Sequence, residues 1–306
     1  MASGIATTAE LPFMDVDFGL RDSVRFSYAR PEDPLLRKAI IRAVELFPGQ
    51  RFLKRRYQDW SLRGHTDDNI FAAGIRALKI NLEFDAKALA AIPARGPLLV
   101  VANHPYGVAD GLALGDIITR ARPDTKIMTH SLLCQPPEAA RYLLPVDFGG
   151  TPEARQKSAR TRMDAMQWMK DGHCVALFPS GGVATRQKPF SGPALDLPWH
   201  PFVSKLSAIP GAKVLPMFFH GRNSTLFHLA SHSFYPLRIA LLFRETLRQF
   251  GERMTVGIGA PVEGTSLPHS DGKQAVADAL RVMAFALDGQ GKSSNKTYVW
   301  PKHVTF

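Results

Sequence analysis

The distribution of apolar residues predicts alternating strands and helices from about residue 96 onward. Short apolar runs bounded by turn residues are typical of buried strands, and apolar positions at helical spacing are typical of amphipathic helices. We therefore expect strands at residues 97–102, 126–130, 143–146, 174–178, 214–219 and 254–259. We expect helices at residues 112–120, 154–170, 202–208, 237–250 and 275–287. This alternation predicts an α/β fold in which helices flank a largely parallel sheet.

The region before this alternation predicts an N-terminal arm followed by an amphipathic helical cap. In residues 34–47, Leu36, Ile40 and Val44 share one face of a helix. The basic and aromatic residues that follow are Arg51, Phe52, Lys54, Arg55, Arg56, Tyr57 and Trp60. Such a helix suits a membrane interface, and it also suits packing on the rest of the protein. We divide the chain into a cap (1–84), an α/β domain (85–265) and a C-terminal helix with a polar tail (266–306).

The net charge of the chain indicates which kinds of binding partner to expect. A net charge of +11 and an isoelectric point near 9.8 favour an anionic partner, although a solvated basic surface has the same composition. Zinc-finger spacing and RNP-type aromatic segments do not occur in the sequence, so we do not expect nucleic acid binding. An anionic membrane and an acidic carrier protein remain. Because the sequence contains no uninterrupted apolar run of about 18 residues, we expect the membrane contact to be peripheral.

Two segments at the expected carboxyl ends of strands carry candidate chemistry. Ligands of open α/β sheets bind at that edge. After strand 97–102, His104 can act as a base, and Asp110 can orient its ring only if the chain turns between them. Pro105 and Gly107 favour such a turn, but a His that merely stabilises a turn fits this pattern too. We find no third metal ligand beside this pair and expect no metal cofactor.

The second segment is a glycine-containing loop after strand 174–178. Ser180, Gly181 and Gly182 follow Phe178 and Pro179 in this loop. Glycines let backbone amides approach an oxyanion or a phosphate closely. A Ser-Gly-Gly sequence is also common in ordinary loops, so this segment is weak by itself.

Taken together, the ordered motifs resemble the glycerolipid (lysophospholipid) acyltransferase family over about residues 85–265. The motifs are Asn103-His104-Pro105 with Asp110-Gly111, Phe178-Pro179-Ser180-Gly181, and Val214-Leu215-Pro216 with Gly221-Arg222-Asn223-Ser224. Within that family the chain looks most like the bacterial aminolipid O-acyltransferases, the hemolysin-like branch that completes ornithine lipids. Leu144-Pro145-Val146-Asp147 and Asp196-Leu197-Pro198-Trp199 are also similar to that branch.

The resemblance implies roles for individual residues. His104 would be the base that activates the acceptor hydroxyl, and Asp110 would orient it. The implied substrate-binding residues are Asn103, Gly111, Ser180, Gly181, Gly182, Pro216, Arg222 and Asn223, together with either Arg155 or Arg160 as the grip on an anionic group. Acyl carrier protein or coenzyme A would present the acyl chain as a thioester, with no other cofactor. The acceptor would be a lyso-lipid, met by a peripheral enzyme at the cytoplasmic face of the inner membrane.

Two departures from the common family pattern bear on the acceptor. Five residues separate His104 from Asp110 where four are usual, and Ser180 stands where the family commonly has Glu. Both favour a lyso-aminolipid such as lyso-ornithine lipid over a glycerol phosphate. Three alternatives remain: acylation of lysophosphatidic acid, acylation of an amine, and a non-catalytic lipid-binding protein of the same fold.

Overall fold

The protein is built around a central eight-stranded sheet. The computed structural model describes residues 69–134, 137–147, 149, 151–233, 235–289 and 296–301, and Arg55 alone. The sheet has the order β1-β9-β8-β2-β5-β3-β4, and β10 pairs with β8. Its strands are β1 (Asn81–Glu83), β2 (Leu98–Ala102), β3 (Lys126–His130), β4 (Leu143–Val146), β5 (Cys174–Leu177), β8 (Lys213–Phe219), β9 (Arg253–Ile258) and β10 (Val262–Glu263). The five strands from β8 to β4 are parallel, and β9 runs antiparallel to β8.

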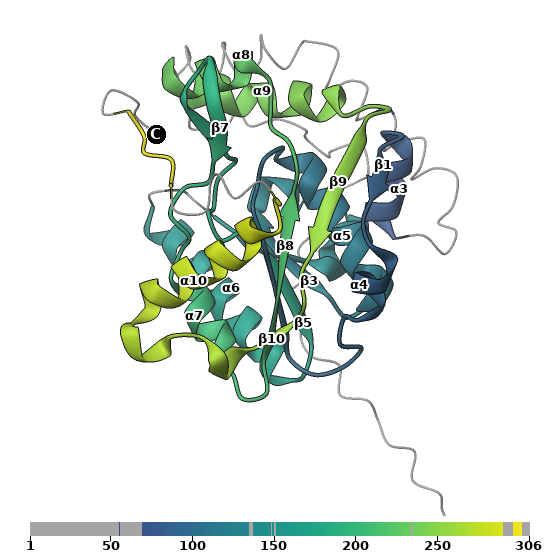
Figure 1. The fold of residues 1–306 in the computed structure, drawn as a ribbon, viewed down its shortest axis with the longest axis vertical. Helices are drawn as coiled ribbons and strands as arrows, with labels where there is room; N and C mark the ends of the chain where they lie inside the picture. The colour runs from purple at the N-terminus through teal and green to yellow at the C-terminus, as the bar shows by residue number, and fades with distance from the viewer. Residues whose placement is uncertain are drawn as a thin grey trace, which may run out of the picture.

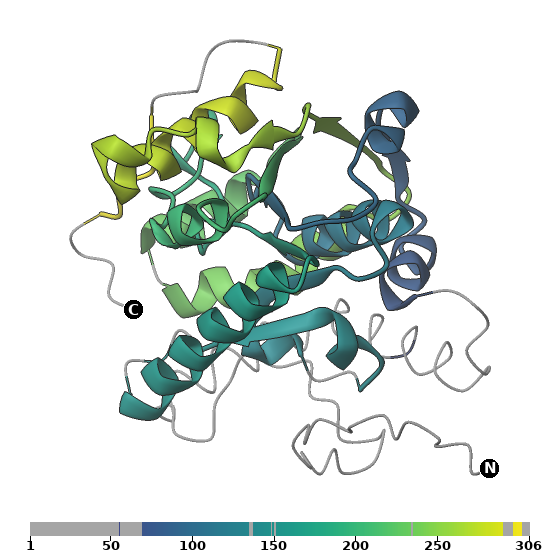
Figure 2. The same ribbon diagram turned by 90° about the horizontal axis from the view of Figure 1, so that it is seen from below.

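Helices cover both faces of the sheet and one of its ends. The helices are α3 (Ile70–Ala77), α4 (Ala86–Ala90), α5 (Val108–Ala121), α6 (Pro152–Lys170), α7 (Phe202–Ser207), α8 (Thr225–Ser233), α9 (Tyr235–Arg248) and α10 (Lys273–Ala286). Figure 2 shows α3, α4 and α5 on one face and α6, α7 and α10 on the other. In Figure 1, α8 and α9 lie across the end of the sheet toward which β8 points. No helix in the described part of the chain has the length and apolar composition needed to cross a membrane.

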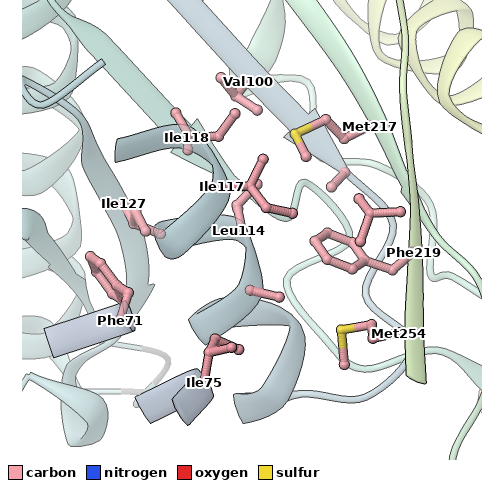
Figure 3. Close-up of a cluster of buried hydrophobic side chains, with 14 of the residues drawn as sticks. Phe71, Ile75, Val100, Leu114, Ile117, Ile118, Ile127, Met217, Phe219 and Met254 are labelled. Atoms are coloured by element: carbon pink, nitrogen blue, oxygen red, sulfur yellow. The ribbon is translucent and has the colours of Figure 1, made fainter. Parts of the chain in front are cut away.

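One half of the core fixes α5 on the sheet, as Figure 3 shows. Leu114, Ile117 and Ile118 of α5 are fully buried in a cluster that includes Val100 of β2. Each buried side chain of this size contributes about 1.5–3 kcal/mol. Helix α3 approaches α5 so closely that a Cβ on Gly115 would lie 2.4 Å from Cγ of Phe71. This packing holds the first turn of α5 at the carboxyl edge of β2.

The opposite face carries the second half of the core. Its buried members come from α6, α7 and α10 and from the strands beneath, and include Met169, Trp199, Val203, Leu206, Val276, Leu280 and Phe285. Thus α10, which we assigned to the C-terminal segment, packs on the same sheet as the central region. The proposed division of the chain at residues 84 and 265 stays a prediction.

The observed elements confirm the α/β fold with a largely parallel sheet. Each expected strand is present. Helix α5 begins at residue 108, four positions earlier than expected, so Asp110 and Gly111 are helical and not part of a loop. The pattern missed the helices α3, α4 and α8, the short strands β1 and β10, and the hairpin of β6 (Thr185–Lys188) with β7 (Ser191–Leu195). The expected cap helix at 34–47 and its basic cluster lie outside the described residues, apart from Arg55.

Candidate active site

The candidate site lies at the end of the central strand, β2. β2 pairs with β5 on one side and β8 on the other, and all three are parallel, so the segments that follow them meet at one edge. The side-chain amide of Asn103 joins two of these segments: Nδ2 donates to the Phe219 carbonyl oxygen (2.9 Å), and Oδ1 accepts from the Phe219 amide (2.6 Å). On the other side, the amide of Ala184 donates to the carbonyl oxygen of His104 (2.7 Å). Asn103 therefore has a structural role beside the site.

A tight turn brings His104 and Asp110 together. Gly107 adopts φ 90° and ψ −112°, a conformation that side chains with a Cβ rarely adopt, and α5 starts at the next residue. The turn places Nδ1 of His104 3.2 Å from Oδ2 of Asp110. The same carboxylate oxygen accepts the amide hydrogen of Tyr106 at 2.9 Å. From the sequence we expected these two side chains to meet only if the chain turned between them. The structure contains both the turn and the contact.

The surroundings of the pair suit a base that is held in one orientation. The Asp110 side chain is fully buried, whereas 17% of the His104 side chain is exposed. The imidazole stacks on the ring of Phe178, with centroids 4.0 Å apart. Nδ1 of His104 faces a carboxylate oxygen, which accepts a hydrogen bond, so the ring hydrogen lies on Nδ1 and Nε2 is left as the basic nitrogen. Asp110 also lies in the first turn of α5, where the helix dipole favours negative charge.

The loop after β5 lies against this turn, and part of its backbone is already hydrogen-bonded. The amide of Gly181 donates to the Phe178 carbonyl oxygen (3.0 Å), and Gly181 has φ 64°. The Ser180 hydroxyl donates to the Gly182 carbonyl oxygen (2.9 Å). Of the three amides that we expected to be available, that of Gly181 is engaged, while those of Ser180 and Gly182 make no hydrogen bond within the described residues.

Sequence reasoning missed the role of Asp196. This carboxylate is fully buried, and its Oδ1 accepts the amide hydrogen of His104 (3.2 Å) while Oδ2 accepts Nε1–H of Trp199 (2.9 Å). Burial raises the pKa of Asp196 to about 6. Asp196 thus holds the backbone of the turn at His104. The motif Asp196-Leu197-Pro198-Trp199 is evident in the sequence, but nothing in it indicates a contact with His104.

Beside the turn lies a group of residues that we call the cationic cluster. Its members are Arg186, Arg222, Asn223, His228 and Arg238, of which Arg222 and Asn223 were predicted. Arg222 is exposed and Asn223 is buried. The amide of Arg186 donates to Nδ1 of the fully buried His228 (3.3 Å). Burial, together with Arg186, Arg238 and Arg222, lowers the pKa of His228 to about 3. Arg186, His228 and Arg238 were not predicted, because no local sequence motif singles them out.

The cluster has more hydrogen-bond donors than acceptors. A neutral His228 that accepts a hydrogen at Nδ1 must carry its own hydrogen on Nε2. Nε of Arg186 and both amide atoms of Asn223 are buried and have no hydrogen-bond partner in the described part of the protein, whereas His228 also interacts with the backbone of Asn223. Arg238 is 3% exposed, donates to Thr185, Ser231 and the Val183 carbonyl, and forms no ion pair with a described residue. An arrangement of this kind favours an anionic ligand.

Four other predicted residues lie outside this cluster. Gly111 is in α5, and a Cβ there would meet nothing within 4 Å. Pro216 lies inside the sheet, opposite Val101 of β2, and packs on Gly259. Arg155 is in the first turn of α6 and is exposed, whereas Arg160 pairs with Asp164, one turn further along the same helix. Across the described ranges, no group of three or more His, Cys, Asp or Glu could hold a metal ion.

Comparison with known proteins extends these observations. A family model described as Acyltransferase matches residues 57–287. The lyso-glycine lipid O-acyltransferase of Phocaeicola vulgatus is 28% identical over 224 residues, which cover 69% of this chain and 77% of that protein. The enzyme of the same name from Bacteroides thetaiotaomicron is 25% identical over 226 residues, which cover 70% of this chain and 80% of that protein. A solved structure, the 1-acyl-sn-glycerophosphate acyltransferase PlsC of Thermotoga maritima, aligns with a TM-score of 0.47 at 16% identity, covering 85% of this chain and 83% of that one. Because the family model spans most of the sequence, this protein belongs to the acyltransferase family.

Proposed function

We propose that this acyltransferase moves a fatty acyl group from a thioester to the hydroxyl of a lyso-aminolipid, with His104 as general base. The observation that carries the proposal is the contact of His104 with the buried Asp110 at the end of the central strand. Two relatives that bear the name lyso-glycine lipid O-acyltransferase support an aminolipid acceptor. Lyso-ornithine lipid, which the sequence motifs favour, belongs to the same chemical class.

The proposed reaction has two proton transfers. Nε2 of His104 takes the proton of the acceptor hydroxyl as its oxygen attacks the thioester carbonyl carbon. The resulting imidazolium is stabilised by Asp110. When the tetrahedral oxyanion collapses, the carbon–sulfur bond breaks and the thiolate receives the proton from His104. The products are an ester and a free thiol. The unengaged amides of Ser180 and Gly182 are candidates for stabilising the oxyanion.

The proposed binding site for the acceptor head group is the cationic cluster. An amino acid joined to a fatty acyl chain through its nitrogen keeps a free carboxylate, which needs cations and hydrogen-bond donors. Arg186, Arg222 and the buried donors of Asn223 and His228 supply both. The position of these groups supports this assignment. The amide of Ala184 is hydrogen-bonded to the backbone of His104, and Arg186 is only two residues further along the chain. A phosphate would be attracted to the same groups, so the acceptor must be tested directly.

We further propose that the acyl donor is a thioester of acyl carrier protein or coenzyme A, and that the enzyme works as a peripheral protein at the cytoplasmic membrane face. The basic character of the chain supports an acidic carrier and an anionic membrane. Neither donor is recognised through a sequence motif that could be identified here, so the assay must include both donors.

The experiment measures transfer of a labelled fatty acyl group by the purified full chain. The donor is the thioester of this acyl group with acyl carrier protein or with coenzyme A. The acceptors are lyso-ornithine lipid, lyso-glycine lipid, lysophosphatidic acid and a free long-chain amine. We expect an alkali-labile ester with one or both lyso-aminolipids and none with the His104→Ala variant. Arg186→Gln should raise KM for the acceptor about ten-fold with little change in kcat, because we assign Arg186 to head-group binding and not to the chemical step.

Three results would overturn the proposal. A preference for lysophosphatidic acid would assign a phosphate acceptor, and an alkali-stable amide would assign an amine acceptor. Tight lipid binding without transfer to any acceptor, from either donor, would indicate a non-catalytic lipid-binding protein.

A further inference from the structure

Four large apolar side chains are exposed beside the candidate site. Phe190, at the turn of the β6–β7 hairpin, is 74% exposed, and Val299 is 64% exposed. Leu226 and Leu229 of α8 are 45% and 40% exposed. The two leucines are three residues apart, so they share one face of α8. We call these four residues the apolar rim.

Hydrogen bonds join the three segments that carry the apolar rim. Nη1 of Arg186 in β6 donates to the hydroxyl of Thr225 at the start of α8 (3.4 Å). On its other side, β6 is joined to Val299, because the amide group of the Gln187 side chain exchanges two hydrogen bonds of 3.1 Å with the Val299 backbone. In Figure 1 the hairpin and α8 lie at the same end of the molecule, beyond the carboxyl end of β8.

The charge around the apolar rim has one sign. From Gly172 to Arg244 the chain contains a single acidic residue, Asp196, and that carboxylate is fully buried. The hairpin and the approach to α8 carry the exposed cations Lys188 and Arg222. Residues 296–301 add Lys296 and no acid. Exposed apolar side chains among cations are the combination that binds an anionic lipid surface, since the apolar groups enter the acyl boundary and the cations meet the head groups.

We propose that the apolar rim inserts into the surface of an anionic lipid bilayer and so presents the edge of the sheet that carries His104 to its lipid substrate. This inference rests on the proposed function for the identity of the substrate, but the docking itself does not depend on catalysis. The connection to the site is short: Ala184, which is bonded to the backbone of His104, immediately precedes the first strand of the hairpin.

The first test is co-sedimentation of the full chain with vesicles of phosphatidylcholine containing phosphatidylglycerol. Phe190→Ser, and separately Leu226→Ser with Leu229→Ser, should each lower the partition coefficient about ten-fold, because an apolar side chain no longer enters the bilayer. Met163→Ser on α6 and Val282→Ser on α10 are matched controls, since these residues are also exposed but lie on helices that flank the sheet. The controls should bind as the parent protein does, and added salt should weaken binding of all variants.

A second readout does not depend on removing a contact. Phe190→Cys and Met163→Cys are each labelled with a polarity-sensitive dye. The native cysteines label poorly, because burial raises the pKa of both Cys134 and Cys174 to about 12. On addition of vesicles, the emission of the dye at residue 190 should shift to the blue, while that at residue 163 should not change.

The outcomes separate this inference from the proposed function. Parent-like binding by both rim variants, within two-fold, together with an unshifted dye at residue 190, overturns the docking proposal even if the enzyme acylates lyso-lipids. Loss of vesicle binding in the rim variants supports docking even if no acceptor is acylated. If the rim variants bind vesicles normally but lose affinity for acyl carrier protein, the surface serves the carrier and the bilayer proposal is wrong. With a monodisperse short-chain acceptor, Phe190→Ser should keep the parent rate.

Discussion

Replacing Asp110 by Asn removes one charge from the site and keeps nearly the same shape. Oδ2 of Asp110 accepts hydrogens from the His104 ring and the Tyr106 amide, and an amide oxygen in that position can accept both. The NH2 group then occupies the place of Oδ1, which has no partner among the described residues. We therefore expect Asp110→Asn to fold and to bind its substrates as the parent protein does.

The expected loss is in the chemical step. At an effective dielectric constant of about 20, an imidazolium and a carboxylate separated by the observed 3.2 Å attract each other by about 5 kcal/mol. The side-chain amide that Asp110→Asn introduces would keep a hydrogen bond to the imidazolium worth about 2 kcal/mol. The difference, about 3 kcal/mol of transition-state stabilisation, corresponds to a fall in kcat on the order of 10².

The assay is steady-state acyl transfer, with thermal denaturation to compare folding. Asp116→Asn provides the control, because Asp116 is a buried carboxylate on the same helix that pairs with Arg120 at 2.6 Å, away from the site. It should lower the melting temperature and leave kcat within about two-fold. If Asp110→Asn retained more than a tenth of the parent kcat, the assignment of His104 as a base supported by Asp110 would be wrong.

Three further variants test the surroundings of the pair. Gly221→Ala places a Cβ 1.7 Å from the Tyr106 hydroxyl oxygen, so it should lower the melting temperature and the activity, and Tyr106→Phe should partly restore both. Since the pKa of Asp196 is raised from 3.8 to about 6, the folded protein binds more protons than the unfolded chain between these values, and the free energy of unfolding should fall by roughly 2 kcal/mol as the pH rises from 4 to 6. Asp196→Asn should remove that share of the fall in a comparison of denaturation curves. Gly181→Val introduces a β-branched residue at φ 64°, which should abolish acyl transfer with a small change in melting temperature because the position is exposed.

The longer strands of the sheet could be predicted because they are short apolar runs, whereas β1 and β10, of three and two residues, could not. Leu98–Ala102 is fully buried, as expected for a parallel strand covered on both faces. The polar residues after β2 and β5 could then be assigned to one edge, which brought His104, Asp110 and Ser180 into a common region. The contact between His104 and Asp110 could not be predicted outright, because it needs a turn whose geometry depends on the backbone conformation of Gly107.

Other parts of the site depend on contacts between distant segments. Asp196 and His104 are 92 positions apart, and no local pattern connects them. The β6–β7 hairpin was missed because Thr185–Lys188 is largely polar and Ser191–Leu195 contains both Gly and Pro, which weaken a strand pattern. Tertiary hydrogen bonds stabilise the hairpin, such as those of Gln187 with Val299.

The proposed mechanism explains why Asp110 and the arginines around His228 lie apart. Asp110 must remain an acceptor for the His104 ring, and an arginine bonded to it would compete with the imidazolium for the same charge. Within the described residues, His104 is the sole ion-pair partner of Asp110, and the arginines lie instead around His228. There, burial and positive charge keep the imidazole of His228 neutral, so that it can act as a donor and not as a second base. Two histidines in one site thus acquire opposite roles from their surroundings: His104 beside a carboxylate is suited to move a proton, and His228 among arginines is suited to bind an anion.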